Sequence, residues 1–185
     1  MTWICRFAPS IASTGHLLRH VEHAWLDSAL AEHADAAHKL VIGHYPIHPV
    51  NGYDHYPVWR VIPEEGRAFW AVLARHGVTA YLCSHVLAFD AQVQQGVLQI
   101  TTGGAGNDWG PGGMMPASTE YFHAVQASVD SSGFRCQVLD TTGKMREWLS
   151  WPPEIPPSGE WKPFPSCPAD GLSPVNLAAP AVLVV

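Results

Sequence analysis

Two short apolar segments, each followed by a histidine, most constrain how this chain can fold. The segment Leu40–Ile42 is rich in β-branched residues and is bounded by glycine and proline, which predicts a buried strand that ends abruptly before His44. The segment Val78–Cys83 repeats this pattern, and His85 follows it after one serine. α/β proteins place site residues at the carboxyl ends of their strands, so two such strands joined by a helix would aim both imidazoles at one point.

The surrounding sequence predicts helices before and between these strands. An apolar stripe with members four residues apart indicates a helix over His16–His38. A second helix is expected to begin at Pro63, with two glutamates in its first turn, and to end before Gly77. The segment 44–62 between strand and helix is a long loop, which in a compact domain is usually functional or mobile.

The second half of the chain reads as β-structure. Gln95-Gly96 predicts a hairpin turn. Three strand-like segments then follow with short turns between them, which predicts an antiparallel meander over Tyr121–Asp130, Phe134–Asp140 and Lys144–Trp151. Nine of the sixteen prolines fall between residues 152 and 180. We therefore expect a folded domain over residues 1–151 and a proline-rich linker or tail over residues 152–185.

Composition limits the classes of function. An apolar fraction of 47% and a charged fraction of 14% are typical of a folded protein, and a net charge of -6 argues against nucleic acid as an electrostatic partner. No CxxC pair occurs among the four cysteines, which favours buried free thiols over a zinc knuckle or disulfides. No membrane span or signal peptide is expected, and the compartment stays open.

Several motifs resemble those of the calcineurin-like metallophosphoesterases, the group that includes the purple acid phosphatases. GHYP at 43–46 resembles the GHxP block of that family, and HGVTAYLCSHVLAFD at 76–90 resembles its last block, where a strand is followed by GHxH. GGAGNDWG at 103–110 resembles the glycine-rich segment downstream. The resemblance covers residues 16–150 and implies an α/β fold: the C-terminal half of a four-layer α/β/β/α sandwich, with a mixed sheet that ends in an antiparallel meander.

The resemblance implies a site in which two divalent ions, such as Fe, Zn or Mn, clamp a phosphate ester and a metal-bound hydroxide attacks phosphorus. It assigns His44 and His85 as metal ligands. The second histidine of GHxH maps to Leu87, which cannot bind a metal, and the glycine of that motif is replaced by Ser84. The family's DxH, GDxxD and GNH blocks are missing before residue 44, so we expect at most one weakly held ion and no catalytic acid in this chain.

Other residues near these motifs are candidate helpers. His48, Tyr53 and His55 lie in the loop after GHYP, where they either contact substrate or are ordinary loop residues. Asp90 is either a partner that orients a ligating histidine or a turn residue. His44 and His85 themselves can also be structural histidines at strand ends.

These observations leave three hypotheses about function. The first is metal-dependent hydrolysis of a phosphate ester, with this chain supplying only the second half of a dinuclear site, so that the isolated chain is inactive. The second is a non-catalytic fragment or pseudoenzyme that acts as an interaction module. The third is an unrelated small α/β binding protein that uses the 44–62 loop. We expect the sheet face opposite the helices to be exposed, or to be covered by the proline-rich tail, by a missing N-terminal half or by a second copy.

Overall fold

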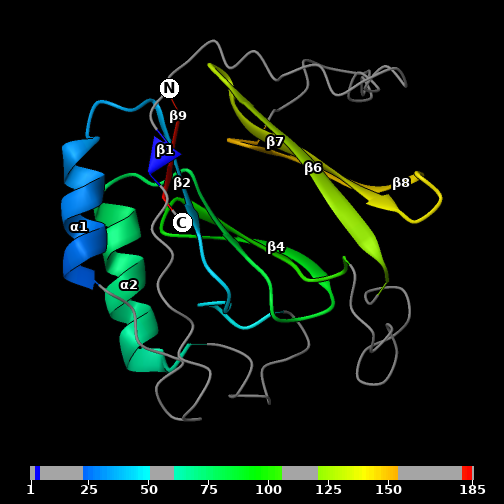
Figure 1. Cartoon of the computed structure of the whole chain (residues 1–185), viewed down its shortest axis with the longest axis horizontal. Helices are drawn as coiled ribbons and strands as arrows, with labels where there is room; N and C mark the ends of the chain where they lie inside the picture. The colour runs from blue at the N-terminus through cyan, green and yellow to red at the C-terminus, as the bar shows by residue number, and fades with distance from the viewer. Residues whose placement is uncertain (1–2, 5–22, 51–60, 106–120, 154–180, 185) are drawn as a thin grey trace.

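A computed structural model describes residues 3–4, 23–50, 61–105, 121–153 and 181–184 of the chain. The described residues form three layers: a pair of helices, a six-stranded mixed sheet and a three-stranded antiparallel sheet (Figure 1). The helices lie on one side of the mixed sheet and the small sheet lies on the other. The protein is therefore a mixed α/β fold, as the sequence predicts.

The two helices differ in how well the sequence defines them. Helix α2 spans Pro63–Arg75 as predicted, with proline in its first turn. It ends in a Schellman motif, because the amide of Val78 donates to the carbonyl of Leu73 at 3.0 Å while Gly77 adopts a φ of +60°. Helix α1 spans only His23–Glu32 of the predicted range. Residues 16–22 lie outside the described part, and His38 belongs to a strand instead.

The mixed sheet contains both predicted histidine-terminated strands as neighbours. Its order is β1-β9-β2-β3-β5-β4, and all its pairs are parallel except β4 with β5. The strands are β1 (Trp3–Ile4), β2 (His38–Ile42), β3 (Ala80–Cys83), β4 (Phe89–Gln94), β5 (Val97–Thr102) and β9 (Ala181–Val184). Helix α2 connects the parallel neighbours β2 and β3, as a crossover between parallel strands requires.

The antiparallel part of the fold follows the predicted turns. Gln95 and Gly96 both have positive φ, 50° and 81°, which is the two-residue type I′ turn that joins β4 to β5. The predicted meander is confirmed as a separate sheet of order β6-β7-β8. Its strands are β6 (His123–Asp130), β7 (Gly133–Asp140) and β8 (Met145–Trp151).

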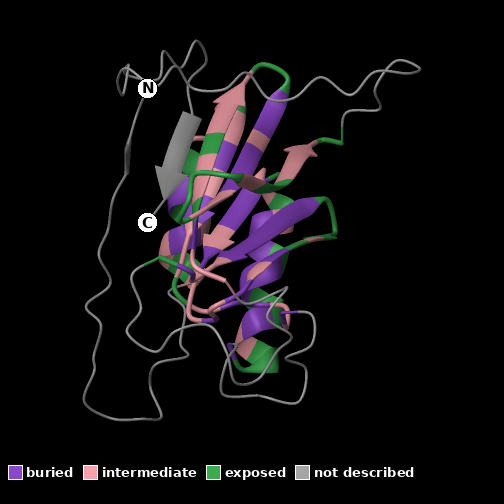
Figure 2. Cartoon of the chain, turned by 90° about the vertical axis from the view of Figure 1, so that its right-hand side faces the viewer, coloured by how far each residue is buried: buried purple, intermediate pink, exposed green. Residues whose placement is uncertain are grey.

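The second sheet overturns the expectation of an exposed sheet face. The face of the mixed sheet opposite the helices packs on the three-stranded sheet, where Ile100, Phe134 and Cys136 are almost completely buried. Figure 2 shows buried residues running along the strands between the layers. The expectation fails because the meander is not part of the same sheet as the parallel strands. It instead folds back as a layer of its own and buries that face.

Two smaller expectations can be compared with the structure. Cys83 and Cys136 are buried free thiols, as predicted; Cys5 and Cys167 lie outside the described residues. The segment Ala181–Val184 is a strand between β1 and β2, whereas residues 154–180 are outside the described part, so the domain boundary after residue 151 stays a prediction. Among the described residues, none of the helices has the length and apolar character that a bilayer crossing requires.

Candidate functional site at the carboxyl ends of β2 and β3

The backbone pairing of β2 and β3 continues past both strands and aligns the two histidines. The amide of Gly43 donates to the carbonyl of Leu82 at 2.9 Å, and the amide of Ser84 donates to the carbonyl of His44 at 3.0 Å. His44 and His85 are therefore held side by side by a ladder that starts in the buried sheet. Their proximity follows from the parallel register, in which Ile42 lies opposite Leu82.

The structure brings the two imidazoles into direct contact. Nε2 of His44 lies 3.0 Å from Nδ1 of His85, and the ring centroids are 5.0 Å apart. The ring of Tyr45 packs against both, with centroid distances of 4.9 Å to His44 and 4.1 Å to His85. His44 is exposed and His85 is half-buried. The histidine pair is therefore accessible to solvent and packs against the Tyr45 ring.

His85 occupies a strained backbone position. Its φ is +67°, and the amide of Val86 donates to the carbonyl of Ser84 at 2.8 Å, two residues back. An i to i+2 hydrogen bond around a residue of positive φ defines the rarer and more strained of the two forms of γ-turn. For a residue other than glycine, strain of this kind costs on the order of 1–3 kcal/mol and is concentrated at functional sites.

Close packing beneath the pair explains two of the glycines. The Tyr81 hydroxyl passes under Gly43 to donate to the carbonyl of Tyr45 at 2.8 Å, and a Cβ at Gly43 would collide with it. A Cβ at Gly103 would collide with the carbonyl of Val86, in the turn that carries His85. Burial raises the pKa of Tyr81 well above its usual value, so this hydroxyl stays protonated and serves as a donor.

A buried glutamine fixes the loop that follows His44. Gln99 is completely buried on β5, and its side-chain oxygen accepts from the amides of Ile47 at 3.1 Å and His48 at 2.9 Å. Its side-chain nitrogen donates to the carbonyl of His48 at 2.9 Å. The side-chain amide of Gln99 thus makes the hydrogen bonds that a neighbouring strand would make. It satisfies backbone groups of the loop that would otherwise be buried without partners.

Asp90 belongs to the same polar layer. Gln92 donates from its side-chain nitrogen both to the Asp90 carboxylate at 3.0 Å and to the carbonyl of Pro49 at 2.9 Å. The neighbouring Cys83 thiol lies 3.2 Å from the Thr101 hydroxyl, and burial raises its pKa to about 12. The thiol is therefore neutral and unreactive at physiological pH, and the role of Asp90 in orienting a histidine stays a prediction.

Of the three predicted substrate contacts, only His48 lies in the described part of the chain. The ring of His48 packs edge-on against Trp70, with centroids 4.4 Å apart. Tyr53 and His55 lie outside the described residues. Within the described ranges, no group of three or more His, Cys, Asp or Glu side chains is arranged to hold a metal ion. In the described part of the chain, the histidine pair thus offers two imidazoles, fewer than the three or more protein ligands that a catalytic metal normally has.

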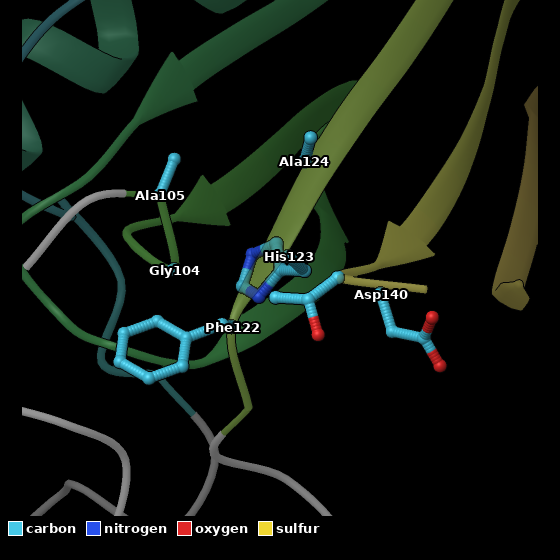
Figure 3. Close-up of a pocket in the computed structure, with 7 residues that line it drawn as sticks. Gly104, Ala105, Phe122, His123, Ala124 and Asp140 are labelled. Carbon is cyan, nitrogen blue, oxygen red and sulfur yellow. The ribbon is translucent and has the colours of Figure 1, made fainter. Parts of the chain in front are cut away.

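A hollow that the sequence does not reveal lies at one end of the small sheet, apart from the histidine pair. It has a volume of about 330 Å³ and is lined by residues of the loop after β5, of β6 and of the β7–β8 turn. Figure 3 shows the His123 ring between Gly104 and Asp140. Nδ1 of His123 donates to the carbonyl of Tyr121 at 2.8 Å, and Nε2 accepts from the Thr102 hydroxyl at 3.1 Å. With both nitrogens satisfied, this histidine is structural.

Comparison with known proteins supports the fold and corrects the family assignment. No family model matches the sequence, and no curated protein matches it. Among solved structures, the chain is similar to GAP50, "the anchor in the inner membrane complex of Plasmodium", with 18% identity and a TM-score of 0.51 over 70% of this chain. The chain spans 42% of the length of that protein.

The assignment to the calcineurin-like metallophosphoesterases is therefore wrong, because no family model supports it. The motifs behind it are short. A glycine, histidine and proline after a buried strand are what any abrupt strand end in an α/β protein can carry. At 18% identity, the likeness to GAP50 establishes a shared mixed α/β fold and nothing about chemistry.

Proposed function

We propose that this chain acts as a non-catalytic interaction module. The donor set at the carboxyl ends of β2 and β3 carries the proposal. Among the described residues it supplies two imidazoles, those of His44 and His85. Neutral imidazoles provide no negative charge to balance two divalent cations, and hydrolytic sites normally use three or more protein ligands per metal.

The likeness to GAP50 also supports a non-catalytic interaction module. That protein is described as an anchor, which is a role of holding other molecules in place. This chain spans 42% of the length of GAP50. A similar anchoring role for this chain is therefore part of the proposal. The alternative that the chain is a hydrolase of phosphate esters has only the convergence and strain of the histidine pair in its favour.

The proposed partner would add a layer on the outer face of the three-stranded sheet. In β7, Phe134 and Cys136 face the mixed sheet, so strand alternation turns Gln137 toward the opposite side. Gln137 is nevertheless only 8% exposed, and its side chain hydrogen-bonds Gln126. An outer face of this kind suits a fourth layer supplied by another chain, which would give an α/β/β/α arrangement.

We also propose that the histidine pair holds at most one divalent ion, and holds it weakly. The 3.0 Å between Nε2 of His44 and Nδ1 of His85 is close to the separation of about 3.3 Å expected for two nitrogens on one tetrahedral zinc. Titration with zinc should show one weak site that is lost in His44→Ala and in His85→Ala. His48→Ala is the matched control and should bind as the unaltered chain does.

Turnover measurements test the main proposal. The purified chain is assayed with p-nitrophenyl phosphate and bis(p-nitrophenyl) phosphate, with Mn²⁺, Zn²⁺ or Fe²⁺ added. We expect no rate above that of the metal in buffer, and no difference between the chain and a His44→Ala/His85→Ala double variant. A metal-dependent rate that disappears in the double variant would overturn the proposal.

A further inference from the structure

The outer edge of strand β4 is built to accept another strand. β4 ends the strand order of the mixed sheet, and among the described strands it pairs with β5 alone. Its pairing runs without a register shift from Phe89 opposite Thr102 to Gln94 opposite Val97. A straight terminal strand presents a row of unpaired amides and carbonyls, which is a template for strand addition.

Most of the usual devices that protect a sheet edge are missing from β4, and its one charged residue, Asp90, is buried on the helix side. Proteins blunt edges with very short strands, prolines, lysines or bulges. At the opposite end of the mixed sheet, β1 is two residues long, and in the small sheet β8 has an irregular register and is followed by Pro152. β4 has the sequence FDAQVQ, which contains no lysine, no proline and no bulge.

An exposed apolar side chain distinguishes β4 from β6, a terminal strand of the small sheet. Val93 is 40% exposed, and Ile62 at 37% is the other large hydrophobic residue exposed in the described part of the chain. Val125 and Val129 of β6 instead pack into the core between the sheets. Ala91 is exposed and shares the face of Val93, so β4 carries a small apolar strip beside its open edge.

The hairpin turn determines which backbone groups of β4 face outward. A two-residue type I′ turn makes Gln94 and Val97 a hydrogen-bonded pair. Because hydrogen-bonded pairs alternate along an antiparallel ladder, the amides and carbonyls of Ala91 and Val93 point away from β5. A partner strand would meet these groups, and the residues on either side of them would stay bonded to β5.

We propose that β4 pairs antiparallel with β4 of a second copy of this chain, across a two-fold axis, to form one continuous sheet. This rests on the proposed function and adds a second contact to it, at the edge of the mixed sheet rather than at the outer face of the small sheet. Because hydrogen-bonded pairs alternate along the strands, the two copies of β4 can align in two registers that keep the middle of one strand opposite the middle of the other. In one, Val93 lies opposite Ala91 of the second copy; in the other, it lies opposite Phe89. Both registers place apolar residues opposite each other, which is the stabilising arrangement for cross-strand pairs.

Charge is compatible with this pairing. Asp90 is the one charged residue of β4, and in the two registers it lies opposite Gln94 or Gln92 of the second copy, so no like charges meet directly. Each copy carries a net charge of -6, which opposes association over longer distances. Added salt screens this repulsion, so the dimer should strengthen between low and physiological ionic strength.

Analytical ultracentrifugation of the full chain over a range of concentrations tests the proposal. A strand of this length spans only about 20 Å, well below a standard interface, so we expect a weak monomer–dimer equilibrium. Val93→Lys should raise the dissociation constant at least about tenfold, which corresponds to about 1.4 kcal/mol. Ile62→Lys, which removes the other exposed hydrophobic residue, should leave the equilibrium unchanged.

Ala91→Pro provides a second, backbone-level test. Proline is tolerated on an edge strand where the amide faces solvent, so this variant should keep its circular dichroism spectrum and lose the dimer. A chain that stays monomeric at the highest concentration overturns the proposal, as does a dimer that is equally stable in both folded variants. Neither result would create phosphatase activity, so failure here is distinct from failure of the proposed function.

Discussion

The two faces of the mixed sheet differ in polarity. This difference separates the residues that stabilise the fold from those that position the candidate site. The face toward the three-stranded sheet is apolar along its length, with Leu98 and Ile100 among its buried residues. The face toward the helices begins apolar, with Val41 and Val97 in the helix-side core. Toward the carboxyl ends it becomes polar, where Gln99 and Thr101 are completely buried.

This contrast shows how one sheet supports two tasks. Apolar burial between the sheets is non-directional and stabilises the layers wherever side chains fit. The polar part of the other face is directional, because each buried group needs a partner at a defined place. It therefore holds the backbone of residues 47–49 in one position, shortly after His44. Four predictions test this division.

The largest effect is expected in the apolar layer. Phe134 is 1% exposed between the two sheets, and Phe134→Ala should lower the free energy of unfolding by about 3–5 kcal/mol because it opens a cavity. Urea unfolding measures this change. Val93→Ala, at a position that is 40% exposed, should change it by less than about 0.5 kcal/mol. Equal losses in the two variants would mean that the sheets do not pack as described.

The next effect belongs to the polar layer. Gln99→Leu leaves the amides of Ile47 and His48 without their acceptor, and the Ile47 amide is the buried one, so we expect a cost of about 1–3 kcal/mol. Hydrogen exchange should accelerate at these two amides more than elsewhere. Leu98→Ala, one residue away on the opposite face, is the control: it should lower global stability without a selective change at the loop.

A smaller effect is expected beneath the histidine pair. Tyr81→Phe removes the hydroxyl that donates to the carbonyl of Tyr45, and should cost about 1 kcal/mol. Gly43→Ala should cost more, because its Cβ collides with that hydroxyl. The double variant should recover part of the loss, since removal of the hydroxyl frees space for the new methyl group. Thermal unfolding of the three variants tests this, and strictly additive losses would contradict it.

The smallest effect is expected at the surface of the helical layer. Hydrogen bonds from His76 and Arg75 lower the pKa of Asp27, which links α1 to α2. A carboxyl whose pKa is lowered in the folded state adds stability above its unfolded pKa of about 3.9 and loses it as pH falls further. Asp27→Asn should therefore destabilise slightly at pH 7 and not at pH 2. A loss that is the same at both pH values would exclude this link.

Local sequence signals predicted much of this fold. Pro63 and Gly77 delimit α2, and Gln95-Gly96 marks the hairpin, because each of these residues meets a backbone requirement that few others meet. The approach of His44 to His85 followed from two parallel strands that each have a histidine two residues past the end, although their role as metal ligands stays a prediction.

What the sequence did not predict depends on contacts between distant segments. The strands of the meander look the same whether they extend the first sheet or form a second one, because alternation fixes only which residues share a face. Gln99 reads as a polar residue in a strand, yet it is buried because its partners come from a loop that lies far earlier in the chain. The strain at His85 likewise has no signal in its sequence neighbours.

The position of β9 has a consequence for the order of folding during synthesis. His38 of β2 is paired with Ala181 of β9, and β1 joins the sheet only through β9. A nascent chain can assemble β2, α2 and β3 early, but β1 must wait for residues 181–184 before its partner strand β9 exists. Until then one side of β2 stays unpaired, which is the stage at which chaperones would be expected to bind.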